Sequence, residues 1–299
     1  MNDVALDLVG VRRRRLEFGS AQLSGGGVLR AVTRRGTARV GLVLLAMVLG
    51  FIALVPILSS QSIYAQTGVQ LQAPSAQHWF GTDQLGRDLM VRLAAGGRTS
   101  LGGAVLALSA AVTIGIVVGV IAASGGRRLD AVLMRGVDAA NGIPPLIIPI
   151  ALVGALGPTY SNLLLAIVIS YVPSYARIAR TFADGLRSRL DIVSAQLLGV
   201  SRKRIAATHI LPAVFTQMLV IATLDVGSVV VALSGLSFVG LGAQAPTPEW
   251  GVLLDDGQMF FTPAPWLLIF PAIAITLVII ASNLLGESIR DALAERDGR

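Results

Sequence analysis

Few residues in this sequence have side chains suited to acid–base, metal or covalent chemistry. Its 299 residues include two histidines, His78 and His209, and no cysteine. Thiol chemistry is therefore excluded, and a single histidine does not make a metal site. Two carboxylates, Asp138 and Asp225, lie within otherwise apolar stretches, where ionisable groups are costly and often functional. A proton relay or a membrane-bound enzyme would need more ionisable partners than these. We therefore expect no catalytic site, no metal and no cofactor on this chain.

ATP hydrolysis requires a motif that the sequence lacks. A phosphate-binding loop has the pattern G-x-x-x-x-G-K-[ST], in which the lysine reaches the phosphates. The glycine clusters at 25–27 and 96–97 have no such lysine. We therefore predict that the chain is not an enzyme.

The composition indicates an integral membrane protein. Hydrophobic residues make up 54% of the chain and charged residues only 14%, with a mean hydropathy of +0.74. Soluble domains carry about 25% charged residues. This balance argues against a soluble enzyme and a disordered chain, and the absence of cysteine excludes a disulfide-rich scaffold.

Apolar segments long enough to cross a bilayer set the predicted fold. A spanning helix needs about 20 apolar residues, and these segments are too long and continuous for the strands of a barrel. We predict an all-α membrane protein with six transmembrane helices. The expected spans lie near residues 40–58, 101–123, 131–156, 160–176, 216–239 and 266–285.

Basic residues predict the orientation in the membrane. All but three of the 24 Lys and Arg residues lie in the segments 1–39, 127–135, 177–204 and 290–299. Such residues concentrate on the cytoplasmic side, where they also attract anionic lipid. Six spans then place both termini there, with tails at 1–39 and 294–299 and a long loop at 177–212. Because the charge follows membrane sidedness, we expect membrane lipid and no nucleic acid as a partner.

The loop at 177–212 carries a recognisable pattern. It resembles the EAA loop of ABC importer permeases, in which E-A-A is followed by three residues, a glycine, nine residues and I-x-L-P. Ala195, Gly199, Leu211 and Pro212 match this pattern. Val193, Ser194 and His209 stand where the pattern has Glu, Ala and Ile.

Four other segments match one branch of these permeases. The chain is similar to the OppC/DppC-type permeases of type I ABC importers over residues 40–293. The matching segments are GTDQLGRD at 81–88, LMRGVDAANGIPPL at 133–146, GLSFVGLGAQAPTPEWG at 235–251 and NLLGESIRDAL at 283–293.

The resemblance implies a fold, a set of partners and a function. The fold is a MetI-like six-helix permease domain with a cytoplasmic coupling helix in the bacterial cell membrane. The partners are a second permease, two ATPase subunits that hold ATP and Mg²⁺, and an extracellular substrate-binding lipoprotein. The substrates are di- or oligopeptides. Alternatives are a permease for nickel or glutathione, or a secondary transporter that acts without ATP.

Two sets of residues are expected to serve this function. The coupling set should contact an ATPase, since apolar side chains flank a glycine that permits a bend. It comprises Val193, Ser194, Ala195, Leu198, Gly199 and Arg202. The translocation path should include a broken helix and an intramembrane acid. It comprises Asn141, Pro144 and Asp225.

Several charged residues invite structural interpretations. Asp138 is expected to pair with Arg135, one helical turn away. Asp83, Arg87 and Asp88 are expected to form a local salt-bridged motif.

The segment before the last span is expected to be an acidic external loop. Its acidic residues are Glu249, Asp255 and Asp256, beside Trp250. Such a loop would contact the binding protein or remain solvated, with the tryptophan at the membrane interface.

Overall fold

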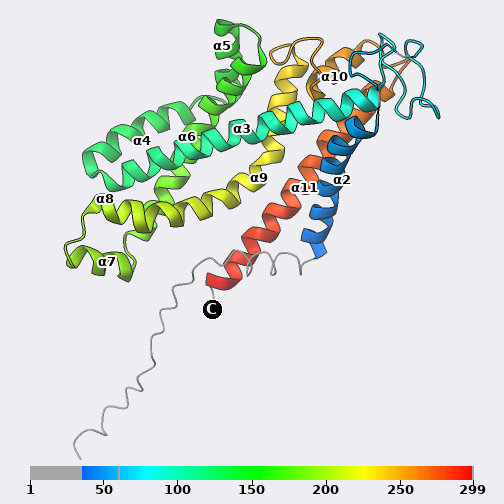
Figure 1. Cartoon of the computed structure of the whole chain (residues 1–299). Helices are drawn as coiled ribbons and strands as arrows, with labels where there is room; N and C mark the ends of the chain where they lie inside the picture. The colour runs from blue at the N-terminus through cyan, green and yellow to red at the C-terminus, as the bar shows by residue number, and fades with distance from the viewer. Residues whose placement is uncertain (1–35, 60, 67, 298–299) are drawn as a thin grey trace, which may run out of the picture.

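The computed structural model describes residues 36–59, 61–66 and 68–297. These residues form helices, turns and two isolated β-bridges. The order along the chain (Figure 1) is α2 (Gly36–Leu58), α3 (Leu89–Ser124), α4 (Arg127–Asn141), α5 (Ile147–Leu156), α6 (Tyr160–Leu186), α7 (Leu190–Leu197), α8 (Arg202–Ile205), the π-helical turn η1 (Ala206–Ile210), α9 (Leu211–Phe238), α10 (Trp250–Gln258) and α11 (Trp266–Asp297).

Five helical stretches of the described chain are long and apolar enough to cross a membrane. They are α2, α3, α6, the continuous helix Arg202–Phe238 that joins α8, η1 and α9, and α11 up to Asp291. This confirms the all-α membrane fold and five of the expected spans.

The third expected span differs from the prediction. The segment 131–156 is divided between α4 and α5, with residues 142–146 between them. Pro144 and Pro145 have no N–H to donate, and a proline disfavours helical geometry in the residue before it. The apolar part left to α5 is only ten residues long. The two helices together therefore occupy the place of the predicted single span.

Helix ends also differ from the ends of the apolar runs. Helix α3 begins at Leu89, 12 residues before the expected start, because Asp88 accepts a hydrogen bond from the Val91 N–H and caps it. Helix α6 continues to Leu186, into the segment expected as a loop. The expected N-terminal tail lies outside the described residues except for 36–39, which begin α2. Helix α11 continues to Asp297, through most of the expected C-terminal tail.

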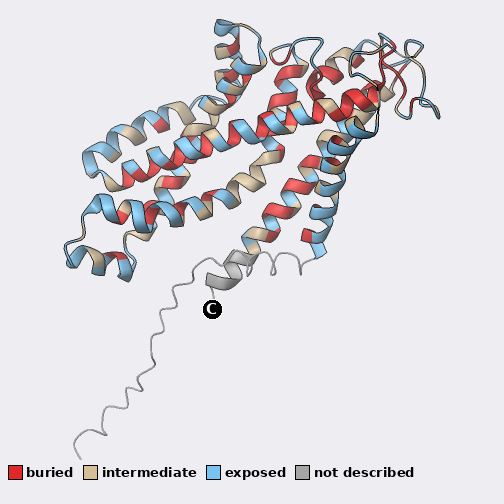
Figure 2. Ribbon diagram, in the orientation of Figure 1, coloured by how far each residue is buried: buried red, intermediate tan, exposed pale blue. Residues whose placement is uncertain are grey.

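Helix α3 is the central element, and α6 packs closely against it (Figures 1 and 2). Two glycines make the close approach possible. A Cβ on Gly115 would lie 2.5 Å from the Cβ of Tyr175, and one on Gly119 would lie 2.6 Å from the Ala176 carbonyl. Small residues at helix contacts are typical of membrane bundles, where packing replaces the hydrophobic effect.

The molecule has two contrasting ends. Helix α10 and the loop 61–88 lie at one end, and α7 and α8 lie at the other (Figure 1). The spanning helices connect these ends, so residues at either end are positioned by the same bundle.

Candidate functional site

Helix α7 has one face fixed to the bundle and one face open. Ile192 is buried in the main core, and Ala195 and Val200 pack against that core. On the opposite side, Leu197 and Leu198 are each 84% exposed. Exposed large apolar residues outside a lipid-facing span are typical of a contact surface.

Gly199 ends α7 in a left-handed turn. Its φ angle is +81°, which an L-residue with a Cβ rarely adopts. The N–H of Gly199 donates to the Gln196 carbonyl, and the N–H of Val200 donates to the Ala195 carbonyl, each at 3.0 Å. These two bonds form a Schellman motif, and Val200 adds the apolar contact that accompanies it. The bend that was expected at Gly199 is therefore present.

The predicted coupling residues fall into two groups in space. Val193, Ser194, Ala195, Leu198 and Gly199 lie on α7 or its terminal turn. Arg202 begins α8, where Ser201 is the N-cap and accepts from the Arg204 N–H. Arg202 also lines a cleft beside α3.

Two of the three predicted path residues are hydrogen-bonded to α6. The Tyr175 hydroxyl on α6 donates to Asp225 on α9 at 2.6 Å. The neighbouring Ser174 donates to the Asn141 side chain on α4 at 2.9 Å. Pro144 is exposed in the break between α4 and α5. The structure thus places Asn141 and Asp225 beside successive residues of α6.

Asp138 pairs with a residue other than the one expected. Its partner is Arg177 on α6, not Arg135 on its own helix. Nearby, Arg180 on α6 makes a two-pronged ion pair with Asp130 on α4, at 2.7 and 3.1 Å. Sequence spacing favoured the local pair, but the α4–α6 contact brings the more distant arginine into reach.

At the other end, charged residues form a buried cluster around Asp83. Arg87 donates to the Asp83 carboxylate at 2.6 Å, and the Arg92 guanidinium lies 3.3 Å from it. Arg92 also lies 3.6 Å from Asp256 on α10. Burial raises the pKa of the Asp256 carboxyl, and the neighbouring Arg92 and Arg87 oppose that shift. Of the expected salt-bridged motif, the Asp83–Arg87 pair is present and Arg92 extends it to α10, whereas Asp88 pairs with His78 instead of an arginine.

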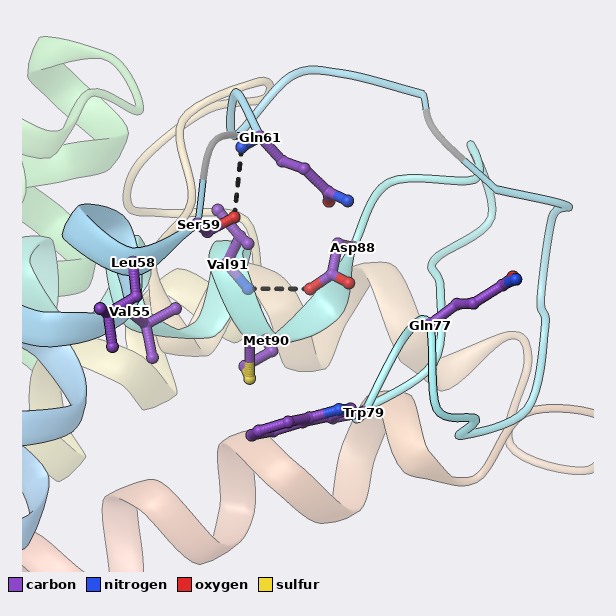
Figure 3. A pocket seen from close by; sticks show the side chains of 9 residues that line it. All are labelled: Val55, Leu58, Ser59, Gln61, Gln77, Trp79, Asp88, Met90 and Val91. Carbon is purple, nitrogen blue, oxygen red and sulfur yellow. Dashed lines mark hydrogen bonds between the residues drawn. The ribbon is translucent and has the colours of Figure 1, made fainter.

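His78 and Asp88 complete this end. The His78 Nδ1 lies 2.8 Å from the Asp88 carboxylate, whose other oxygen caps α3. Beside them, the end of α2, the loop and the start of α3 enclose a cavity of about 310 Å³ (Figure 3). Trp79 and Met90 line it and approach one another in Figure 3. The cavity opens next to the tightly bonded part of the loop.

Glu249 contradicts the expectation of an exposed acidic loop. It is 0% exposed and accepts from the hydroxyls of Ser100 and Ser234, at 2.6 and 2.9 Å. Its second oxygen caps α10 by accepting from the backbone N–H groups of Gly251 and Val252. The carboxylate is buried because four donors from three helices replace its water.

Trp250 is buried as well, so its ring is not exposed as an interfacial tryptophan would be. Its indole N–H donates to the Leu93 carbonyl at 2.9 Å, and its backbone N–H donates to Ser100. Sequence reasoning missed this junction, since its serine partners lie about 150 and 15 positions from Glu249 along the chain. Only the unusual acid inside an aromatic and glycine-rich segment hinted at it.

These features define an all-helical, multi-pass membrane protein with a bonded platform at one end and an open apolar helix at the other. Residues 115–296 match the family described as "Binding-protein-dependent transport system inner membrane component". The chain belongs to this family, which confirms the ABC permease resemblance. The family consists of transport components, which also confirms that the chain is not an enzyme.

Curated relatives with named roles are similar over most of the chain. A dipeptide transport system permease protein, DppC, of Alkalihalophilus pseudofirmus is 40% identical over 86% of this chain and 84% of its own length. A nickel transport system permease protein, NikC, of Escherichia coli is 38% identical over 75% of this chain and 81% of its own length. A glutathione transport system permease protein, GsiD, of Escherichia coli is 38% identical over 74% of this chain and 73% of its own length.

Proposed function

We propose that this chain is a permease subunit of an ATP-driven importer for di- or oligopeptides. In this proposal it forms the translocation path with a second permease, and two ATPase subunits supply ATP hydrolysis with Mg²⁺. An extracellular lipoprotein delivers the substrate. Family membership and the similarity to the dipeptide permease support this assignment. Nickel and glutathione remain alternative substrates, because relatives with those roles are 38% identical.

The single observation that carries the coupling role is the open face of α7. Leu197 and Leu198 are exposed at its end, while Ile192 anchors the same helix in the core. An ATPase subunit that binds the leucines would pull on a helix fixed to the bundle. Movement of the ATPases would then reorient α6 and α9 as packed bodies, in the manner of rigid-body switching.

The two ends suggest an orientation. The basic segment 177–204 includes α7 and α8, so we assign this end and both termini to the cytoplasm. The loop 61–88, the cavity beside Trp79 and α10 then face the outside, where the binding protein docks. The chain has no cysteine, so single-cysteine variants test this assignment directly. Val69→Cys should react with a membrane-impermeant maleimide in intact cells, whereas Leu197→Cys should react only after the cells are opened.

The translocation path is assigned to Asn141, Pro144 and Asp225. Asp225 is half-buried and bonded to Tyr175, and Asn141 is bonded to the adjacent Ser174. These polar groups lie where α4 and α9 approach α6. Pro144 lies in the break between α4 and α5, and a broken helix can present backbone groups to a polar path.

The decisive experiment is purification of the tagged chain from native membranes, followed by mass spectrometry of the proteins that accompany it. Recovery of a second six-span permease, two P-loop ATPases and a lipoprotein is expected. Uptake of labelled di- and tripeptides, with nickel and glutathione as competitors, then assigns the substrate. A chain that purifies alone from several detergents and transports without ATP would instead be a secondary transporter.

A further inference from the structure

A cleft separates the end of α3 from the junction of α8 and α9. Its volume is about 590 Å³, within the range of about 300–1,000 Å³ that holds small-molecule ligands. The walls include apolar residues from three helices, and two cations lie at its edge. The residues that the argument uses are Val117, Ile121, Leu129, Leu211, Arg202 and Lys203.

The apolar wall of the cleft lacks a cover. Val117 and Ile121 on α3 are 49% and 47% exposed, and Leu129 on α4 is 41% exposed. Ser124 also lines the cleft, and its hydroxyl has no hydrogen-bond partner among the described residues. A ligand with an apolar body and a polar end would satisfy both features.

The edge of the cleft is cationic. Arg202 and Lys203 are exposed, and no ion pair involves either of them in the part of the chain that the structure describes. Arg127 and Arg128 directly precede Leu129 and add charge at the start of α4. The nearby acid, Asp130, is already held by Arg180. The unmatched charge at this edge is therefore positive.

We propose that this cleft binds one anionic phospholipid. The acyl chain lies along Val117, Ile121 and Leu129, and the phosphate pairs with Lys203 and Arg202. Basic pockets between helices near the cytoplasmic surface suit such headgroups. A free phosphate or nucleotide would leave the apolar wall uncovered. The proposal rests on the cytoplasmic assignment of this end.

A lipid at this place would have a mechanical effect. It would connect α3 and α4 to α8, which follows α7 after four residues. The position of α7 relative to the bundle would then depend on the lipid, as would the response to an ATPase.

The test is native mass spectrometry of the full chain with the subunits that accompany it. The complex is exposed to equal amounts of phosphatidylglycerol and phosphatidylcholine. Retention of one phosphatidylglycerol is expected, and Lys203→Gln should weaken it by about fivefold, the effect of one basic residue near a membrane. Arg204→Gln is the matched control, since Arg204 is exposed and adjacent but does not line the cleft. Equal losses in both variants, or no preference for the anionic lipid, would overturn the proposal.

A second pair of variants tests the apolar wall without changing charge. Ile121→Trp should fill the cleft and abolish lipid retention. Ile114→Trp, on the same helix and 44% exposed but outside the cleft, should retain the lipid. Retention by Ile121→Trp would place the lipid elsewhere and overturn the assignment.

A partner protein that occupies the cleft is the remaining alternative to a lipid, and one further variant distinguishes the two. Ala207 lines the cleft and is exposed, so the reactivity of an Ala207→Cys variant reports whether the cleft is covered. Maleimide labelling should be slow with phosphatidylglycerol and fast after delipidation. Labelling that stays slow after delipidation would show that a subunit covers the cleft and would overturn the lipid proposal. These measurements do not require transport, so failure of the importer assignment would appear separately, as missing ATPases.

Discussion

The two ends of the molecule treat their side chains in opposite ways. At the α10 end, Asp83, Asp88 and Glu249 are buried carboxylates, and each accepts hydrogen bonds from backbone or side-chain donors. At the α7 end, Leu197 and Leu198 project with 84% of their surface exposed. The first end satisfies its buried carboxylates internally, whereas the second presents two adjacent exposed leucines on one short helix.

This difference indicates what each end requires. Burying a leucine side chain contributes about 1.5–3 kcal/mol, so two exposed leucines offer a partner a substantial gain. The buried carboxylates offer a partner little, because their bonds are already made within the chain. The α10 end is thus a stable platform, and the exposed leucines of the α7 end fit the proposed contact with an ATPase subunit.

The largest expected effect is at Glu249. Glu249→Ala would remove the acceptor for two hydroxyls and two backbone N–H groups in a dry site, at about 1–3 kcal/mol for each group left unpaired. We expect loss of the folded protein or a large fall in Tm, measured by fluorescence-detected size exclusion after heating. Asp255→Ala is the control, since the one bond that Asp255 makes within the described part of the chain is accepted from the Gln258 side chain. A Glu249→Ala protein as stable as this control would contradict the platform interpretation.

The Glu249 junction also shows where sequence reasoning stops. An acid next to prolines and a tryptophan has the composition of an external loop, and nothing local reveals Ser100 or Ser234. The same holds for Arg92, which lies before the expected start of the second span at residue 101 but inside α3. There the Asp88 cap and the pairing with Asp83 and Asp256 stabilise the helix.

Other parts of the fold were accessible because their signals are local. Of the six spans predicted from the long apolar runs, five are present as spanning helices among the described residues, and Gly199 predicted the turn that ends α7. Pro144 and Pro145 signalled a break, but hydropathy alone merged α4 and α5 into one span. The predicted partner of Asp138, Arg135, was wrong, because helix packing brings Arg177 of α6 to this carboxylate.

The next effect concerns the open end and is expected in transport, not in stability. Leu198→Asp should reduce peptide uptake more than tenfold and abolish co-purification of the ATPases, because a charge would be buried in their contact. The Tm of the chain should stay unchanged, since the side chain is 84% exposed. Val69→Asp, at the opposite end where Val69 is 74% exposed, is the matched control for co-purification of the ATPases, which it should leave intact. Normal uptake by Leu198→Asp would remove the distinction between the two ends.

A smaller effect is expected at the turn that ends α7. Gly199→Val would force a β-branched residue to a φ of +81°, at a cost of about 1–2 kcal/mol. A Cβ at this position would have no atom within 4 Å, so the strain is in the backbone alone. The variant should insert normally yet lose ATP-driven uptake, and Gly199→Asn should retain more activity because asparagine tolerates this conformation.

The control for the turn lies one helix away. Gly185 in α6 also has open space around it but has an ordinary helical φ. Gly185→Ala should therefore leave uptake unchanged and raise helix stability slightly. A loss of uptake in Gly185→Ala equal to that in Gly199→Val would show that the left-handed turn is not the cause.

The smallest effect is expected midway between the two ends, at the pair of Tyr175 and Asp225. Their hydrogen bond is 2.6 Å long, and bonds of this kind within membranes contribute about 0.6 kcal/mol on average. Tyr175→Phe keeps the Cβ and backbone that pack on Gly115 and should lower stability by about that amount, measured by unfolding in mixed micelles. If Asp225 lines the path, Asp225→Asn should slow uptake several-fold while the ATPases still co-purify, unlike the α7 variants.

The double variant Tyr175→Phe, Asp225→Asn then separates the two roles. If the effects of the two changes are non-additive on the free energy of unfolding but additive on uptake, the hydroxyl contributes to packing and the carboxylate to the path. Normal uptake by Asp225→Asn would make the pair a structural contact alone.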